Sequence, residues 1–268
     1  MACALYTGLS LAHWRFKRCQ LDVALGERMV WWMLAGGLLG AHFFSVLLYF
    51  PEKVASDPWL LLRVWEDISS FGGMLGGLAG AAVYLWFRLP EREAPRRWAY
   101  LDTIGFVFPF ALAIGRVGCS LAHDHPGTIT HFPLAFSLQS EAARNYISDV
   151  YYGAGRALPG NAVLSTMGFN DLGWYEFLYL SLIMLPVLLV LDKRKHAPGF
   201  NLLTSSMLYL PVRFAFDFLR VSDARYAGLT PGQWTAIVAA TALPFLWQSM
   251  RSRASAPATN EPGVEATI

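Results

Sequence analysis

Long apolar runs separated by short polar segments make up most of the chain. The runs cover residues 1–14, 28–50, 68–89, 99–119, 173–191, 200–219 and 232–250. All but the short first run have about 20 apolar-dominated residues, the length that an α-helix needs to cross a bilayer. Lipid offers the backbone no hydrogen-bond partners, so these runs are predicted to be helices. The pattern predicts an all-α integral membrane protein with about seven transmembrane helices.

Basic residues gather after every second run and set the predicted orientation. If the N-terminus lies outside, every cluster falls on the cytoplasmic side, as the positive-inside rule requires. We therefore expect the C-terminus to be cytoplasmic. The clusters are Arg15, Lys17 and Arg18, then Arg88, Arg92, Arg96 and Arg97, then Lys193, Arg194 and Lys195, and finally Arg251 and Arg253.

The segments between the runs complete the predicted organisation. Residues 1–253 form a single transmembrane domain, and the polar residues 254–268 form a disordered cytoplasmic tail. Residues 120–172 are too many for a simple connection, so they are predicted to form an extracytoplasmic cap between the fourth and fifth helices. Within it, residues 132–136 fit either a short strand or a dip into the membrane interface.

Composition agrees with a membrane protein. The chain has 55% hydrophobic and 15% charged residues and a mean hydropathy of +0.38, against about 25% charged residues in soluble domains. The formal net charge of +2 gives no reason to expect a nucleic-acid partner. We expect a monomer. The first run lacks a preceding basic region, so it reads as a short first span and not as a normal signal peptide.

Several side chains that could take part in catalysis or binding lie close together in residues 114–127. This stretch contains Arg116, Cys119, His123, Asp124 and His125 directly after an apolar run. A histidine beside a carboxylate can act as a base near neutral pH, although the same residues also fit a merely polar loop.

A metal site is the weaker interpretation of these histidines. Zinc would need a further ligand such as His131, and two close histidines alone are weak support for it. The sequence therefore predicts no metal and no cofactor.

A second group of charges ends the sixth run. Arg213, Asp217 and Arg220 are spaced to share one helical face. A charge facing lipid costs about 2.5–3.5 kcal/mol, so this face should meet a cavity or a partner. Because the fourth and sixth runs both lead outward, Arg116 and Arg213 should reach similar depth, near Glu176. The alternatives are internal ion pairs of Arg213 with Asp217 or Glu176, and a phosphate site open to the outer leaflet.

Small residues begin the third run. Gly72 and Gly73 open a series of glycines that favours close helix packing, or a smooth wall for an acyl chain. Cys3 and Cys19 are predicted to be packing residues. His42, inside the second run, is predicted to be a hydrogen-bonded core residue.

Several of these stretches together resemble the bacterial phosphatidylglycerol–prolipoprotein diacylglyceryl transferases. The likeness extends from about residue 36 to residue 250, and the most specific part is the combination of Gly-Arg-x-Gly at 115–118 with the later Tyr-x-x-x-Arg-x-x-x-acid-x-x-Arg at 209–220. The other matching stretches are residues 57–66, 72–76, 102–118, 132–135, 175–176 and 232–233.

The resemblance implies an enzyme of the bacterial inner membrane that moves a diacylglyceryl group from phosphatidylglycerol to a cysteine thiol of a prolipoprotein and releases glycerol phosphate. Its partners would be an anionic phospholipid and the prolipoprotein signal peptide. The implied catalytic residues are Arg116, Asp124, Arg213 and Asp217, to which we add His123 as the base. Substrate binding would fall to Gly72, Gly73, Cys119, His125, Glu176, Tyr209 and Arg220.

The chain departs from the family's pattern where the thiol would be handled. Phe71 stands in place of the family's histidine, Cys119 in place of an asparagine, and Ala41 in place of an arginine, while residues 170–173 replace a His-Pro-x-Gln stretch. The alternative hypothesis is therefore a catalytically silent paralogue that binds anionic lipid or a membrane partner. A small transporter is a weaker third hypothesis, because no internal repeat is visible.

Overall fold

The computed structural model describes residues 2–66 and 68–254, and it is mainly helical. The helices are α1 (Ala2–Arg18), α2 (Val23–Leu48), α3 (Pro51–Ser56), α4 (Ser70–Phe87), α5 (Arg97–Ala122), α6 (Glu141–Gly153), α7 (Asn161–Leu164), α8 (Leu172–Tyr179), α9 (Leu185–Leu191), α10 (Phe200–Asp217) and α11 (Pro231–Ala254). Shorter helical segments are η1 (Pro58–Leu62), η2 (Glu91–Arg96) and the π-helical η3 (Leu180–Met184), and the strands are β1 (Pro126–Thr130), β2 (Phe136–Ser137) and β3 (Gly168–Asp171).

Among the described residues, four helical segments are long and apolar enough to cross a membrane. They are Val23–Leu48, Ser70–Phe87, Glu91–Ala122 and Leu172–Leu191. These correspond to the second to fifth predicted spans, so a helical membrane protein is confirmed. The other predicted spans are also helical, as α1, α10 and α11, but the total of seven spans stays a prediction.

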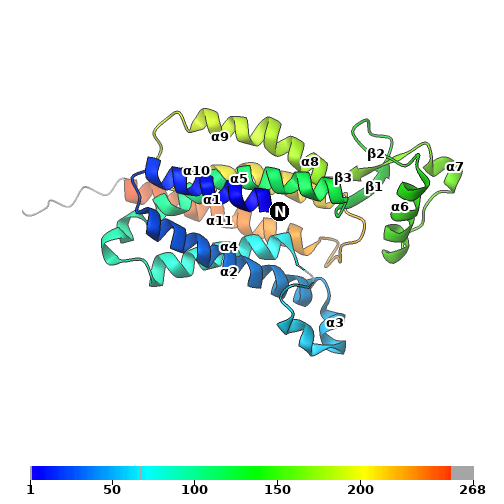
Figure 1. Cartoon of the computed structure of the whole chain (residues 1–268), viewed down its shortest axis with the longest axis horizontal. Coiled ribbons are helices and arrows are strands. Elements are labelled where there is room, and N and C mark those ends of the chain that lie inside the picture. Colours follow the sequence, from blue (N-terminus) through cyan, green and yellow to red (C-terminus); the bar gives the residue numbers. More distant parts are fainter. Residues whose placement is uncertain (1, 67, 255–268) are drawn as a thin grey trace, which may run out of the picture.

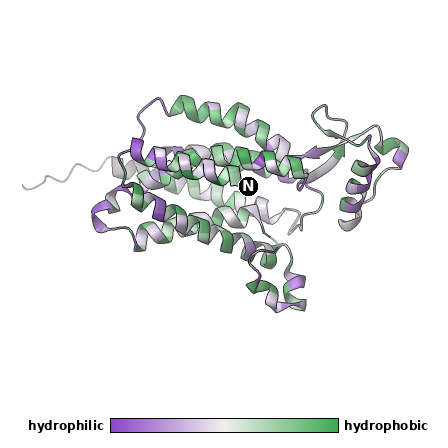
Figure 2. Cartoon of the chain, viewed as in Figure 1, coloured by the Kyte–Doolittle hydropathy of each residue, from purple (hydrophilic) through white to green (hydrophobic). Residues whose placement is uncertain are grey.

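The long helices form one elongated bundle (Figure 1). Helix α5 packs against α1, α8 and α10, while α2 pairs with α4 and α10 with α11. Apolar residues cover much of the outer surface of these helices (Figure 2), and exposed ones include Leu38, Leu47 and Val190. An apolar exterior of this kind is what a bilayer environment requires.

Several of the predicted basic clusters lie close together in the fold. Arg15 and Arg18, at the end of α1, both pair with Asp192 after α9. Arg96, before α5, donates to the backbone oxygens of Cys19 and Gln20. Helix α11 also ends on this side, at the left of Figure 1. The predicted basic clusters therefore meet at one end of the bundle, opposite the small unit that contains the strands.

That small unit, residues 126–171, occupies the other end and is what we call the cap (Figure 1). Its three strands form an antiparallel sheet in the order β1-β3-β2, with Ile129 opposite Phe169 and Phe136 also opposite Phe169. Helices α6 and α7 complete it around a core that includes Leu138 and Ile147. The sheet adds β-structure to the predicted all-α fold. Strand β2 begins at Phe136, the last residue of the segment left undecided between strand and interfacial dip.

Close packing of α2 on α4 explains the glycines. A Cβ on Gly36 would lie 2.5 Å from the backbone oxygen of Gly76, and one on Gly40 would lie 2.5 Å from that of Gly72. Side chains there would force the helices apart. Gly73 packs more loosely, with its added Cβ 3.6 Å from that of Ala41. The contacts therefore support helix packing, and not a wall for an acyl chain, as the role of this series.

Three smaller predictions are also decided. His42 is fully buried, and its ring nitrogens lie 2.7 Å from Glu66 O and 2.9 Å from Leu60 O, which confirms a hydrogen-bonded core residue. Cys3 and Cys19 are exposed, so their assignment to packing inside the protein was wrong. The predicted disordered tail lies outside the described residues, except for Ala254, which ends α11.

Candidate functional site

The end of α5 turns the chain back on itself. His123 caps the helix in the left-handed conformation, with φ of 49°. The backbone nitrogen of Asp124 lies 3.4 Å from the oxygen of Cys119, which closes the helix as in a Schellman-type cap. This reversal brings the Asp124 and His125 side chains back towards Cys119, and the ligand atoms of the three residues lie within 4.8 Å of one another.

Glu176 joins two arginines from different helices. Its Oε2 lies 2.6 Å from Nε of Arg116, on α5, and its Oε1 lies 3.1 Å from Nη1 of Arg213, on α10. Tyr209 donates a 3.1 Å hydrogen bond to Oε2 of the same carboxylate. The structure thus brings together four residues that the sequence proposed for one site, and Glu176 is the residue that they share.

Asp217 supplies the second carboxylate of this cluster. Its Oδ1 lies 2.7 Å from Nη1 of Arg213, and its Oδ2 accepts a 2.7 Å hydrogen bond from Thr230. The ring of Phe71 faces the same guanidinium, with its centroid 5.1 Å from Cζ of Arg213. The aromatic residue that replaces the family's histidine therefore contacts the predicted site.

The cluster is closed to solvent. Arg116 is 3% exposed, Arg213 2%, Glu176 1% and Asp217 0%. Two guanidiniums face two carboxylates, so the charges balance, which limits the cost of burying them. The contacts are those of the internal ion-pair alternative, and the predicted opening of Arg116 and Arg213 towards the outer leaflet is not seen. A phosphate could reach these arginines only by taking the place of a carboxylate.

His123 points away from this cluster and into the cap. Its Nδ1 lies 2.7 Å from Oδ2 of Asp171, a fully buried residue that also caps α8 through Trp174 N. Phe136 and Phe169 contact the imidazole edge to face. His123 lines a cavity of about 400 Å³ within the cap. Asp171 can hold the proton on Nδ1, which leaves Nε2 as the basic nitrogen.

His125 has different surroundings. Its Nδ1 lies 3.1 Å from Oδ1 of Asp124. Burial lowers the pKa of His125 to about 4, and the positive charges of Arg220 and Arg116 act in the same direction. The imidazole is therefore neutral at neutral pH. Of the two histidines, His125 is the one that lies beside Cys119, whose Sγ is 3.7 Å from Nη1 of Arg116.

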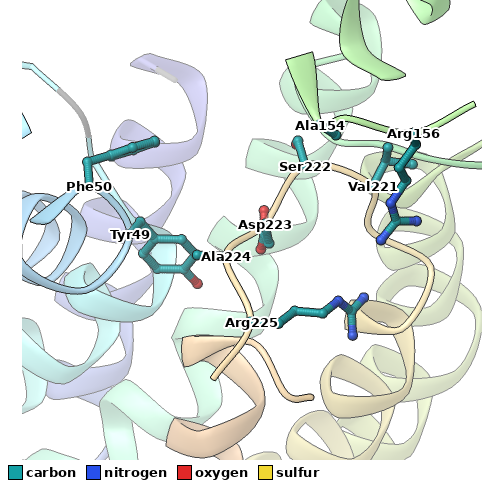
Figure 3. A pocket seen from close by; sticks show the side chains of 9 residues that line it. All are labelled: Tyr49, Phe50, Ala154, Arg156, Val221, Ser222, Asp223, Ala224 and Arg225. Carbon is teal, nitrogen blue, oxygen red and sulfur yellow. The ribbon is translucent and has the colours of Figure 1, made fainter. Parts of the chain in front are cut away.

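A cavity of about 520 Å³ lies beside the loop that follows α10 (Figure 3). Tyr49 and Phe50, after α2, line it together with Arg156 of the cap and residues 221–225. Its residue Asp223 pairs with Arg220 at 3.1 Å, and Nη2 of Arg225 lies 3.4 Å from the backbone oxygen of Asp217. Arg225, which lines the cavity, therefore contacts the backbone of Asp217, a residue of the buried charge cluster.

Sequence reasoning identified both arginines and both carboxylates of the cluster but missed Asp171 and Thr230. Asp171 had a usable signal, because an acidic residue directly before an apolar helical run is a typical N-cap. No sequence signal marked Thr230, because its partner Asp217 lies on another segment. Gly72 and Gly73, proposed for substrate binding, contact α2.

Known proteins resemble the chain along almost its whole length. The family model described as prolipoprotein diacylglyceryl transferase matches residues 1–248. Three relatives carry the name phosphatidylglycerol–prolipoprotein diacylglyceryl transferase. The protein from Xanthomonas oryzae pv. oryzae is 28% identical over 98% of this chain and 90% of its own length. The protein from Nitratidesulfovibrio vulgaris is 27% identical over 86% of this chain and 78% of its own length. The protein from Chromohalobacter salexigens is 27% identical over 78% of this chain and 70% of its own length. The chain belongs to the prolipoprotein diacylglyceryl transferase family.

Proposed function

We propose that this protein transfers the diacylglyceryl group of phosphatidylglycerol to a cysteine thiol of a prolipoprotein. The thiolate sulfur attacks the glyceryl carbon that carries the phosphate and forms a thioether. The carbon–oxygen bond breaks, and its electron pair leaves on the phosphate oxygen of glycerol phosphate. The observation that carries the proposal is the pair Arg116 and Arg213, which two separate helices hold on the single carboxylate of Glu176.

Both arginines suit a leaving group that gains negative charge. A guanidinium binds phosphate oxygens in a bidentate manner, and such fixed positive groups stabilise developing charge most strongly where water is excluded. Glu176 and Asp217 keep the guanidiniums neutralised until a phosphate takes a carboxylate's place. In that exchange Tyr209 and Thr230 can retain the displaced carboxylates through their hydroxyl groups.

The phospholipid headgroup is proposed to enter through the cavity lined by Tyr49, Arg156 and Arg225. Two arginines among its lining residues favour an anion (Figure 3). In the proposed orientation the N-terminus is outside, the basic end of the bundle is cytoplasmic and the cap is extracytoplasmic, so the cavity would lie at the outer face of the bacterial inner membrane. The membrane-facing surface of the helices would admit the acyl chains.

His123 is the proposed base for the acceptor thiol. Asp171 fixes its ring, and its cavity in the cap offers room for a peptide segment. Asp171, the N-cap of α8, precedes Glu176 by five residues, and a helix rises about 1.5 Å per residue. The base would therefore act roughly 7–8 Å outward from the arginines, on the side from which a secreted prolipoprotein approaches.

Transfer can be measured by mass spectrometry with labelled phosphatidylglycerol and a lipobox peptide. Arg116→Lys keeps the charge but loses the planar fork, and we expect transfer to fall by about 100-fold or more. Arg15→Lys is the matched control, because Arg15 is also a buried arginine, paired with Asp192 at 2.7 Å, but lies at the other end of the bundle. Undiminished transfer by Arg116→Lys would remove the role assigned to this arginine. His123→Ala should also abolish most transfer.

Rescue of a transferase-deficient bacterium separates this enzyme from a silent lipid-binding relative. The enzyme should restore growth, and its product should carry the label on the cysteine of the peptide. A peptide with serine in place of the cysteine should stay unlabelled. Binding of phosphatidylglycerol without rescue and without product would favour the silent paralogue instead.

A further inference from the structure

Cys119, Asp124 and His125 offer a thiolate, a carboxylate and an imidazole to one point. Their ligand atoms lie within 4.8 Å of one another. In a tetrahedral zinc site, bonds of about 2.0–2.3 Å place ligand atoms roughly 3.3–3.6 Å apart. Small side-chain rotations would therefore complete the geometry. His131, the third ligand that the sequence suggested, is not part of this group.

The backbone holds these residues in place. Cys119 lies in the last turn of α5, and the left-handed residue His123 reverses the chain directly after it. The backbone nitrogen of Leu172 donates a 3.2 Å hydrogen bond to the oxygen of His125, and this bond ties the returning strand to the start of α8. The spacing of the three residues thus follows from a helix cap and a strand contact, and it does not depend on a flexible loop.

The positive charges nearest to the group are each paired with a carboxylate. Arg116, Arg213 and Arg220 are each paired with a carboxylate, among Glu176, Asp217 and Asp223. The carboxylate of Asp124 and an ionised thiolate of Cys119 are additional negative charges at the same place. A divalent cation bound to them would restore the balance. Arg116 Nη1, 3.7 Å from the sulfur, would help to hold the thiolate form.

We propose that Cys119, Asp124 and His125 bind a zinc ion whose fourth position takes the thiol of the acceptor cysteine. Three protein ligands with one open position are typical of catalytic zinc sites. Asp124 is about half-exposed, so one side of the site is open to solvent and a peptide can enter there. The role of the acceptor rests on the proposed function, whereas the metal site rests on the ligand geometry alone.

Zinc would prepare the nucleophile for the transfer. The acceptor thiol replaces a water molecule on the metal and loses its proton to His123, the proposed base, because a thiol bound to zinc is deprotonated. The zinc-bound sulfur then attacks the glyceryl carbon, and glycerol phosphate leaves with the bonding electron pair. The thioether product is a weak ligand and dissociates. His123 would then be a proton acceptor near the site, and His125 would serve the metal.

Metal binding is tested first on the purified full-length chain in detergent. After dialysis against zinc and then against metal-free buffer, inductively coupled plasma mass spectrometry should find about one zinc per chain. Cys119→Ser and His125→Gln should each lower zinc affinity at least tenfold. Cys19→Ser and His123→Gln are the matched controls and should retain the metal. A wild-type chain that holds no more zinc than Cys119→Ser would overturn the proposal, as would equal losses in the controls.

Cobalt tests the ligands and the acceptor without any turnover. The Co²⁺ protein should show the visible bands of a tetrahedral ion and a thiolate-to-cobalt absorption in the near ultraviolet. Cys119→Asp, which keeps a ligand, should retain the visible bands and lose the thiolate absorption, so loss of fold cannot account for the result. A lipobox peptide should roughly double the thiolate absorption of the wild-type protein, and its serine analogue should not.

These outcomes separate the two proposals. Transfer by a chain that binds neither zinc nor cobalt would overturn the metal site and leave the proposed function standing. A cobalt spectrum that responds to the cysteine peptide in a chain without transfer activity would support the metal site and count against the proposed function. A cobalt spectrum that the cysteine peptide leaves unchanged would overturn the assignment of the open position to the acceptor.

Discussion

Nε of Arg116 lies 2.6 Å from Oε2 of Glu176, and both side chains are almost fully buried. Their pairing connects α5 to α8, and the other oxygen of Glu176 extends it to Arg213 on α10. A carboxylate shared by two guanidiniums can be exchanged for another anion without leaving the arginines uncompensated. This relationship is the basis for the first prediction.

Glu176→Gln should weaken the fold and strengthen anion binding. Removing one partner of a buried ion pair leaves an uncompensated charge and costs about 3–5 kcal/mol. The same excess of positive charge should lower the dissociation constant for glycerol phosphate by at least tenfold. Thermal unfolding and calorimetric titration measure the two effects. Glu52→Gln, at an exposed position on α3, is the control, and unchanged anion affinity in Glu176→Gln would argue against carboxylate exchange.

Asp171→Asn separates the helix-capping role of Asp171 from its contact with His123. Asparagine caps helices about as well as aspartate, so α8 should keep its first turn while His123 loses the charge that orients it. We expect kcat for transfer to fall by about 100-fold, with KM little changed. Asp22→Asn is a matched control, because Asp22 caps α2 through Leu25 N at 3.1 Å. Equal effects of the two substitutions would reduce Asp171 to a structural role.

Thr230→Val should loosen Asp217. The hydroxyl of Thr230 donates to Oδ2 of Asp217 at 2.7 Å, and both residues are fully buried. Loss of a hydrogen bond to a buried charged group costs about 1.5–3 kcal/mol. Chemical or thermal unfolding would measure the loss, against Thr241→Val, whose hydroxyl contacts only the backbone of its own helix. Wild-type stability in Thr230→Val would show that Asp217 is held well enough by Arg213 alone.

Gly76→Ala should push α2 and α4 apart. Its added methyl group would approach the backbone oxygen of Gly36, which cannot move without moving α2. Overpacking of this kind costs about 1–3 kcal/mol. Gly118→Ala, on α5, meets nothing within 4 Å and should be neutral or stabilising by up to about 1 kcal/mol, because alanine is the better helix former. A melting temperature that falls in Gly118→Ala and not in Gly76→Ala would refute this account.

The apolar runs predicted where the helices lie because hydrophobic length is a local property of the chain. The spacing of Arg213 and Asp217 placed both on one helical face, and their pairing, which the structure shows, was one of the two alternatives that the sequence left open. The motif at 115–118 and its partner at 209–220 were enough to recognise the family. The cap sheet and the exposed positions of Cys3 and Cys19 were not foreseen, because both depend on what the rest of the chain covers.

Tertiary structure alone decided which groups meet. Glu176 lies 60 residues after Arg116 and 37 before Arg213 in the sequence, and only the packing of α5, α8 and α10 makes it their common partner. The fold also gives the two histidines different partners: His123 contacts Asp171, and His125 lies beside Cys119. Charges that are distant in the sequence carry no local signal of their pairing, because the free energy of burying each one is set by the partner that another helix delivers.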